Sequence, residues 1–177
     1  MNSMEIGEAK RGQEEAKRSF CGKYRKILFF LRLLAALAAL VASVLMGVNE
    51  QTSLVAGFAI KASYDSSPTF KFFVIGNAIV CAYLFVSLLP LVYNSLEGCA
   101  IDILDLVHLT LLMASASSAT AIGYVSKYGN EKIGWMKVCP FVEDFCRLSL
   151  LSVACSYAAL LLFFSICALS RTNIPSR

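Results

Sequence analysis

The sequence predicts an all-α membrane protein in which four transmembrane helices form one bundle. Hydrophobic residues make up 58% of the 177 residues, only 16% are charged, and the mean hydropathy is +0.67, unlike a soluble domain. Four apolar runs have the roughly 20 residues needed to cross about 30 Å of hydrocarbon. They lack the apolar and polar alternation of membrane-barrel strands. The runs are residues 27–48, 72–93, 103–125 and 148–169, within one expected domain of residues 27–170.

A polar tail, residues 1–26, precedes the first apolar run and carries seven Lys or Arg residues against four Glu. Positive charge beside the first helix predicts that both this tail and, after four crossings, the carboxyl terminus are cytoplasmic. The expected outer segments are 49–71 and 126–147, and the other expected cytoplasmic segments are the turn 94–102 and the short tail 171–177.

Two further roles of the cytoplasmic side stay open. The basic tail is also suited to binding anionic lipids of the inner leaflet. Cys21 and Cys99 lie near the same face, where palmitoylation is an alternative to a free thiol.

Small residues recur at every fourth position along two of the expected helices. In lipid, such stripes allow close backbone approach and van der Waals packing. We expect the first and third helices to touch along them, although Ala-rich segments also give this spacing by chance. The stripes are Ala35, Ala39, Ser43 and Gly47 in the first helix, and Ser115, Ala119 and Gly123 in the third.

Two charged residues interrupt the apolar runs, Arg32 in the first and Asp105 in the third. A charge at membrane depth costs on the order of 3 kcal/mol and normally pairs inside the protein. If both segments enter the bilayer from the same side, the two charges lie at similar depth, so the sequence predicts an intramembrane charge pair. His108 lies three residues after Asp105, on the same helix face. The group is therefore either a structural lock or part of a proton relay.

Asn77 lies inside the second apolar run. We expect its side chain to donate an interhelical hydrogen bond, worth about 0.6 to 2 kcal/mol in a membrane. A contact with a ligand is the alternative.

The expected outer loop before the fourth helix contains Cys139 and Cys146 around an aromatic and acidic segment. On the oxidising side of a membrane, two nearby cysteines tend to form a disulfide, and closing this short loop is expected to stabilise the fold by about 2 to 3 kcal/mol. A metal site would need more ligands than this loop offers. Trp135, Phe141 and Phe145 are expected to face a partner, with lipid-interface anchoring as the alternative for Trp135.

The motifs of common enzyme active sites are absent from the sequence, which has no Gly-rich phosphate loop, zinc-ligand set or nucleophile elbow. We therefore expect a protein without catalytic activity, cofactor or metal. The basic residues behind the net charge of +4 lie mainly beside the first helix. They indicate a topology signal rather than a nucleic-acid partner.

Four ordered segments between Lys26 and Leu169 carry a family resemblance. They read LRLLAALAALVASVLMGVNEQT, ASYDSSPTFKFFVIGNAIVCAY, LDLVHLTLLMASASSATAIGY, and GN, GW, C and FC in the second outer loop. The pattern resembles the plant CASP-like family, named for the Casparian strip membrane domain proteins and related to the four-helix MARVEL proteins. The family's helix-one Arg, helix-three Asp and loop cysteines fall on Arg32, Asp105, Cys139 and Cys146. Segment 52–62, TSLVAGFAIKA, differs from that of Casparian strip proteins proper and favours the broader CASP-like group.

This resemblance implies a multi-pass plasma-membrane protein that forms homo- and hetero-oligomers. In this reading the chain is a scaffold that organises membrane domains or localises extracellular cell-wall-modifying enzymes. The alternative is a small channel or proton-linked transporter that uses Arg32, Asp105 and His108. That alternative requires a polar lining which continues through the membrane.

Overall fold

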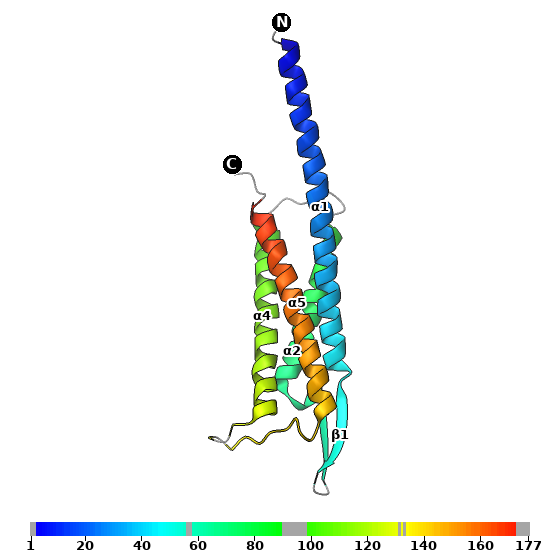
Figure 1. Cartoon of the computed structure of the whole chain (residues 1–177), viewed down its shortest axis with the longest axis vertical. Coiled ribbons are helices and arrows are strands. Elements are labelled where there is room, and N and C mark those ends of the chain that lie inside the picture. The colour runs from blue at the N-terminus through cyan, green and yellow to red at the C-terminus, as the bar shows by residue number, and fades with distance from the viewer. Residues whose placement is uncertain (1–2, 56–57, 90–98, 131, 133, 173–177) are drawn as a thin grey trace.

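Four long helices and one β-hairpin make up the computed structural model, which describes residues 3–55, 58–89, 99–130, 132 and 134–172 (Figure 1). The hairpin and a short 3₁₀ turn lie between the first two helices. The elements in chain order are α1 Ser3–Gly47, β1 Glu50–Val55, β2 Phe58–Ser63, the turn η1 Tyr64–Ser66, α2 Pro68–Val86, α4 Cys99–Tyr128 and α5 Glu143–Thr172.

All four helices are long and apolar enough to cross a membrane, which confirms the predicted four-span, all-α membrane fold. The apolar segments within them are Gly22–Gly47, Pro68–Val86, Ile101–Tyr128 and Glu143–Ser170. Helix α1 begins and α5 ends at one end of the bundle, whereas the hairpin and the α4–α5 loop lie at the other end (Figure 1).

Helix boundaries extend past the apolar runs where the flanking residues also favour helix. Helix α1 starts at Ser3, so the polar tail continues the first span well beyond the bundle (Figure 1). Helix α2 starts at Pro68, which occupies the first helical turn after an extended Ser67, a position that suits the fixed proline φ. The expected end of this helix at residue 93, and residues 94–98 of the expected turn, lie outside the described residues; residues 99–102 belong to α4.

The hairpin between α1 and α2 was not expected from the sequence, which indicated only an outer loop there. Strands β1 and β2 pair antiparallel, with Glu50 opposite Ser63 and Val55 opposite Phe58. The exposed ammonium of Lys61 lies 2.5 Å from the Glu50 carboxylate, and this hydrogen bond and charge raise the pKa of Lys61. Residues 52–55 and 58–62, from the segment whose sequence differs from that of Casparian strip proteins proper, make up most of the two strands.

The four helices form a ring in which α1 and α4 are diagonal. Helices α2 and α5 lie between them, and each of the two packs against both α1 and α4. The expected contact of the first and third helices along their small residues is therefore wrong. Small residues permit close approach to any neighbour, and here that neighbour is α2 or α5.

The small residues of the two stripes have unequal surroundings. Ala35, Ala39, Ser115 and Ala119 are at most 1% exposed. The Ser43 hydroxyl donates to the Val74 carbonyl of α2 at 3.0 Å, and a Cβ added to Gly47 would come 4.0 Å from the Val74 side chain. Ser115 faces Gly76 of α2, where an added Cβ would lie 3.0 Å from the Ser115 Cβ. A Cβ added to Gly123 meets nothing within 4 Å.

Candidate functional site

Arg32 and Asp105 form an ion pair inside the bundle, across the diagonal between α1 and α4. One guanidinium nitrogen, Nη2, lies 2.5 Å from Asp105 Oδ2, and the other, Nη1, donates to Oδ1 at 3.1 Å. Each residue is only 2% exposed. This two-point geometry is the strong form of a carboxylate–guanidinium contact. The two opposite charges cancel, so the pair carries no net charge inside the bundle.

Two side chains at the end of α2 complete the group. The Ser87 hydroxyl accepts from Arg32 Nη1 at 2.7 Å and donates to the Leu84 carbonyl at 2.8 Å. The Tyr83 hydroxyl donates to Asp105 Oδ1 at 2.6 Å. The sequence does not single out Tyr83 and Ser87, although their i and i+4 spacing puts both on one helix face. Ser87 bonds to Arg32 of α1 and Tyr83 bonds to Asp105 of α4, so α2 connects these two helices.

His108 is beside this group but is not bonded to its charges. Its Nδ1 lies 2.8 Å from the Leu104 carbonyl of its own helix. Its ring stacks on Tyr83, with centroids 3.8 Å apart and planes within 8°. Tyr83 thus contacts both Asp105 and His108, and the histidine has a packing role at the α2–α4 contact.

Asn77 makes an interhelical hydrogen bond, but the expected direction is wrong. Its side-chain oxygen accepts from the Ser156 hydroxyl of α5 at 2.9 Å, while its nitrogen donates to the Phe73 carbonyl of its own helix at 2.9 Å. Asn77 and Ser156 are both fully buried. The amide nitrogen is taken up by the preceding turn of α2, which leaves the oxygen to reach across.

The hydroxyl groups that follow Asp105 along α4 are bonded mainly within their own helix, and one of them, Thr120, also lies 3.1 Å from the Tyr157 hydroxyl of α5. Ser115, Ser117 and Ser118 each donate to the carbonyl three residues earlier, and Thr120 donates to the carbonyl four residues earlier. Ser117 and Thr120 are exposed on the outside of the bundle. These side chains therefore do not form a hydrogen-bonded chain across the span.

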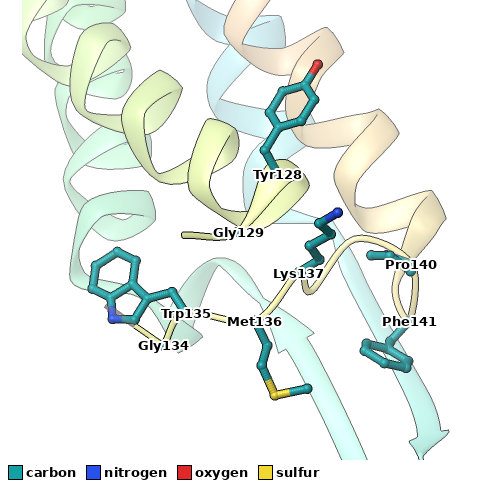
Figure 2. Close-up of a pocket in the computed structure, with 8 residues that line it drawn as sticks. All are labelled: Tyr128, Gly129, Gly134, Trp135, Met136, Lys137, Pro140 and Phe141. Atoms are coloured by element: carbon teal, nitrogen blue, oxygen red, sulfur yellow. The ribbon is translucent and has the colours of Figure 1, made fainter. Parts of the chain in front are cut away.

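The three aromatic residues that were expected to face a partner divide into two exposed residues and one buried residue. Trp135 is 51% exposed and Phe141 is 41% exposed, whereas Phe145 is 6% exposed. Figure 2 shows Trp135 and Phe141 on opposite sides of Lys137. The expectation that Phe145 faces a partner is wrong. It lies in the first turn of α5 and packs edge-on against Phe70 of α2, with ring centroids 5.9 Å apart.

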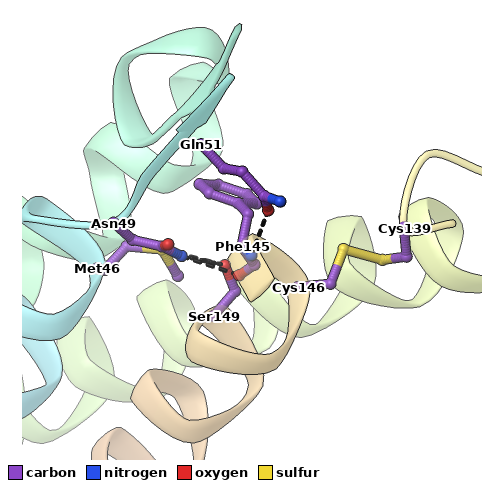
Figure 3. The surroundings of a disulfide bond; sticks show 7 residues. All are labelled: Met46, Asn49, Gln51, Cys139, Phe145, Cys146 and Ser149. Carbon is purple, nitrogen blue, oxygen red and sulfur yellow. Dashed lines mark hydrogen bonds between the residues drawn. A yellow bond between two sulfur atoms is a disulfide. The ribbon is translucent and has the colours of Figure 1, made fainter. Parts of the chain in front are cut away.

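The predicted disulfide between Cys139 and Cys146 is confirmed, and it joins the loop to the first turn of α5. The hairpin is fastened to the same turn (Figure 3). Asn49 donates to the Phe145 carbonyl at 2.8 Å and to the Ser149 hydroxyl at 3.1 Å. The Gln51 side-chain oxygen accepts from the Phe145 amide at 2.9 Å, which satisfies an amide that has no partner within the helix.

Metal-binding geometry is not found among the residues that the structure describes, where no three His, Cys, Asp or Glu side chains gather. The side chains of Cys21 and Cys99 lie outside the described part of the chain. The buried charge group and the disulfide-closed end of the bundle are therefore the two candidate sites.

Comparison with known proteins places this arrangement in a family. Residues 22–172 match the family described as the Casparian strip membrane protein domain. Casparian strip membrane protein 1 of Medicago truncatula is 36% identical over 154 residues, which cover 82% of this chain and 83% of that protein. CASP-like protein 1C3 of Populus trichocarpa is 39% identical over 143 residues, which cover 80% of this chain and 87% of that protein.

No solved structure matches this chain. The family match nevertheless covers the hairpin, the disulfide loop and all four apolar segments. This chain is therefore a multi-pass membrane protein that belongs to the Casparian strip membrane protein domain family.

Proposed function

We propose that this chain is a non-enzymatic scaffold of the plasma membrane that assembles laterally with copies of itself and with related proteins. In this role it organises a membrane domain and localises cell-wall-modifying enzymes on the outer side. The observation that carries the proposal is the closed charge group, in which Arg32 and Asp105 are bound to each other, to Ser87 and to Tyr83. Such a group stabilises one helix arrangement and leaves no charge free for transport.

The relatives support the same class of function. One of them is named a Casparian strip membrane protein and another a CASP-like protein, and both align over most of their length. Their names state membership of the same membrane-protein family, and the role in organising a membrane domain is our proposal for this chain.

The conduit alternative is less well supported. A transport path would need polar groups that continue from Asp105 toward the outer end. The α4 hydroxyls instead donate to their own helix, and only Thr120 among those at 115–120 also contacts another helix, at the Tyr157 hydroxyl. His108 stacks on Tyr83 instead of extending the charge group.

In the proposed orientation both termini are cytoplasmic, and the hairpin and disulfide loop are outside. The basic residues before α1 support this orientation through the positive-inside rule. The disulfide supports it too, since disulfides persist in an oxidising compartment. Trp135 and Phe141 are then the exposed aromatic residues that face outer partners.

Subunit counting tests the proposal directly. The full-length chain carries a fluorescent tag at its carboxyl terminus and is expressed at low level in plant plasma membrane, where stepwise photobleaching counts the copies in each spot. We expect several copies in each spot, and a wild-type chain that bleaches in single steps would refute lateral assembly.

Asp105→Asn separates the scaffold from the conduit. If the charge group is structural, the variant lowers the number of copies in each spot, and the double variant Arg32→Leu with Asp105→Asn recovers part of it. Asp102→Asn is the matched control, because it removes an acid one turn earlier on the same helix. If Asp105→Asn assembles normally but changes proton flux, the conduit alternative is correct.

A further inference from the structure

A cavity of about 600 Å³ lies at the junction where α1 ends and both β1 and α5 begin. Its size falls in the roughly 300–1,000 Å³ range of small-molecule sites. Residues 48–51 form one wall, and the first turns of α5 form the other, with Asp144, Phe145, Arg147, Leu148 and Leu151. The charge group and the disulfide do not account for this cavity.

Hydrogen bonds between the two walls fix the shape of the cavity. Asn49 donates to the Phe145 carbonyl at 2.8 Å, and the Gln51 side-chain oxygen accepts from the Phe145 amide at 2.9 Å (Figure 3). Asn49 and Phe145 are only 4% and 6% exposed. The walls are therefore set before a ligand arrives, which lowers the entropic cost of binding.

The cavity lies at the depth where the hydrocarbon of a bilayer gives way to its headgroups. The apolar segment of α1 ends at Gly47, and that of α5 begins at Glu143. On the side of the spans, Val48 and Leu151 are 68% and 53% exposed, and Val44, one turn deeper in α1, is 50% exposed. Exposed aliphatic side chains at this depth are suited to contact the acyl chains of a lipid.

Two opposite charges at the cavity are open to a ligand. Arg147 and Asp144 are three residues apart on α5 and therefore share a helix face. Both are exposed, and neither takes part in the ion pairs among the residues that the structure describes. Glu50 differs, because its carboxylate is paired with Lys61. A guanidinium binds phosphate oxygens through two parallel hydrogen bonds, so the pattern favours a phosphate beside a cationic group.

The lining also indicates which cationic group fits. The quaternary ammonium of choline is recognised by aromatic faces. Phe145 is the aromatic residue of this lining, and it is buried against Phe70. A primary ammonium instead donates three hydrogen bonds, which the Asp144 carboxylate can accept. The headgroup that matches both charges is phosphoethanolamine.

From these features we propose that the cavity binds one molecule of phosphatidylethanolamine. The phosphate lies at the Arg147 guanidinium and the ammonium lies beside Asp144. The acyl chains run from the cavity along Val48 and Leu151 toward the membrane interior. In the proposed orientation this lipid belongs to the outer leaflet. The site goes beyond the scaffold role and does not rest on it, since a single copy of the chain contains every lining residue.

Native mass spectrometry of the purified full-length chain in detergent tests the proposal, because it counts bound lipids one at a time. The chain is titrated separately with dioleoyl-phosphatidylethanolamine, dioleoyl-phosphatidylcholine and dioleoylglycerol. We expect the first phosphatidylethanolamine to bind about threefold to fivefold more tightly than the first phosphatidylcholine, as for one exposed ion pair, and dioleoylglycerol to bind most weakly. Equal binding of the three lipids would mean unselective contact with the protein surface and would overturn the proposal.

A headgroup without acyl chains separates a lipid site from a site for a soluble phosphate compound. Glycerophosphoethanolamine, at the same concentration as the lipid, should not displace bound phosphatidylethanolamine, because it lacks the contacts with the aliphatic side chains. Displacement at equal concentration would show that the apolar side of the cavity is not used and would overturn the lipid assignment.

Variants of the two charges separate their roles. Arg147→Gln should weaken the first phosphatidylethanolamine and the first phosphatidylcholine alike, by about threefold to fivefold. Asp144→Asn should weaken phosphatidylethanolamine to the level of phosphatidylcholine and leave phosphatidylcholine unchanged. Lys137→Gln is the matched control, an exposed cation at the same end of the bundle that does not line this cavity. Equal weakening by Lys137→Gln and Arg147→Gln would show diffuse charge attraction and would also overturn the proposal.

Discussion

Arg32 is tolerated at membrane depth because its charge is neutralised and most of its donors are bonded. Nη1 and Nη2 reach Asp105 and Ser87, and the Asp105 carboxylate also accepts from Tyr83. Nε is the one buried side-chain polar atom without a hydrogen-bond partner among the described residues. Removing one member of such a group leaves a buried charge unpaired, which costs more than replacing both members by apolar residues.

The first prediction follows from that asymmetry. Asp105→Asn should lower the free energy of unfolding by about 3 to 5 kcal/mol, because Arg32 keeps its charge without a counterion. The double variant Arg32→Leu with Asp105→Asn should recover part of this loss. The measurement is reversible unfolding of the purified chain in detergent micelles.

Asp102→Asn is the control for this prediction. Its acid lies in the first turn of α4, where the helix dipole makes it worth less than about 1 kcal/mol. A double variant no more stable than Asp105→Asn would contradict the structural account of the pair.

At the scale of the helices, α2 determines how closely its neighbours approach. Its Val74 carbonyl accepts from Ser43 of α1, and its Gly76 faces Ser115 of α4. On the buried face of α2, Asn77 accepts a hydrogen bond from Ser156 of α5. One short segment of α2 therefore contacts all three other helices, mostly through small or polar groups.

The second prediction concerns Gly76→Ala. The added Cβ would lie 3.0 Å from the Ser115 Cβ, so α2 and α4 must separate slightly, and we expect a loss of about 1 to 3 kcal/mol in unfolding free energy, as for overpacked cores. Replacing Ser115 by glycine in the same chain should restore part of it.

The matched control is Gly123→Ala, which adds the same methyl group on α4 where nothing lies within 4 Å. It should be neutral or stabilise the chain by up to about 1 kcal/mol, because alanine loses less backbone freedom in a helix than glycine does. Equal destabilisation by the two variants would rule out the close contact as the cause.

The third prediction tests the disulfide at the start of α5. Replacing Cys139 and Cys146 by serine should lower the unfolding free energy by about 2 to 3 kcal/mol, since a seven-residue separation closes a short loop. The hairpin remains attached through Asn49 and Gln51. Helix α5 should therefore stay folded while the loop becomes more sensitive to protease.

Unfolding under non-reducing conditions and limited proteolysis measure the two effects. Cys155→Ala removes a thiol from the same helix without touching the loop, and it should leave the proteolysis pattern unchanged. Loss of the whole bundle in the serine variant would contradict the independent anchoring of the hairpin.

For the whole molecule, the four spans separate two ends of different character. At one end α1 continues as a long helix rich in charged residues, and α5 finishes nearby (Figure 1). At the other end the hairpin and the disulfide loop share the first turn of α5 as their attachment (Figure 3). The proposed outer surface is thus a single unit fixed to the bundle.

The fourth prediction tests the orientation. A membrane-impermeant maleimide should label Leu54→Cys in intact protoplasts, because Leu54 lies in the hairpin and is 80% exposed. Ser3→Cys should react only after the membrane is permeabilised. The opposite labelling pattern would reverse the proposed topology.

The sequence by itself determined the membrane class, the four spans and the disulfide. It also determined that two charged residues within the spans, Arg32 and Asp105, require partners. Each of these follows from one segment at a time, since apolar length selects a span and a charge in lipid requires a counterion. The CASP-like resemblance also came from the sequence, and the family comparison confirmed it.

Only the tertiary structure decided which helices meet. Small-residue stripes permit close packing but do not specify which helix packs against them. The sequence therefore could not show that α1 and α4 are diagonal. The same holds for Tyr83 and Ser87, for the buried position of Phe145 and for the hairpin. These depend on contacts between residues far apart in the chain, and such contacts exist only once α2 and α5 lie between the other two helices.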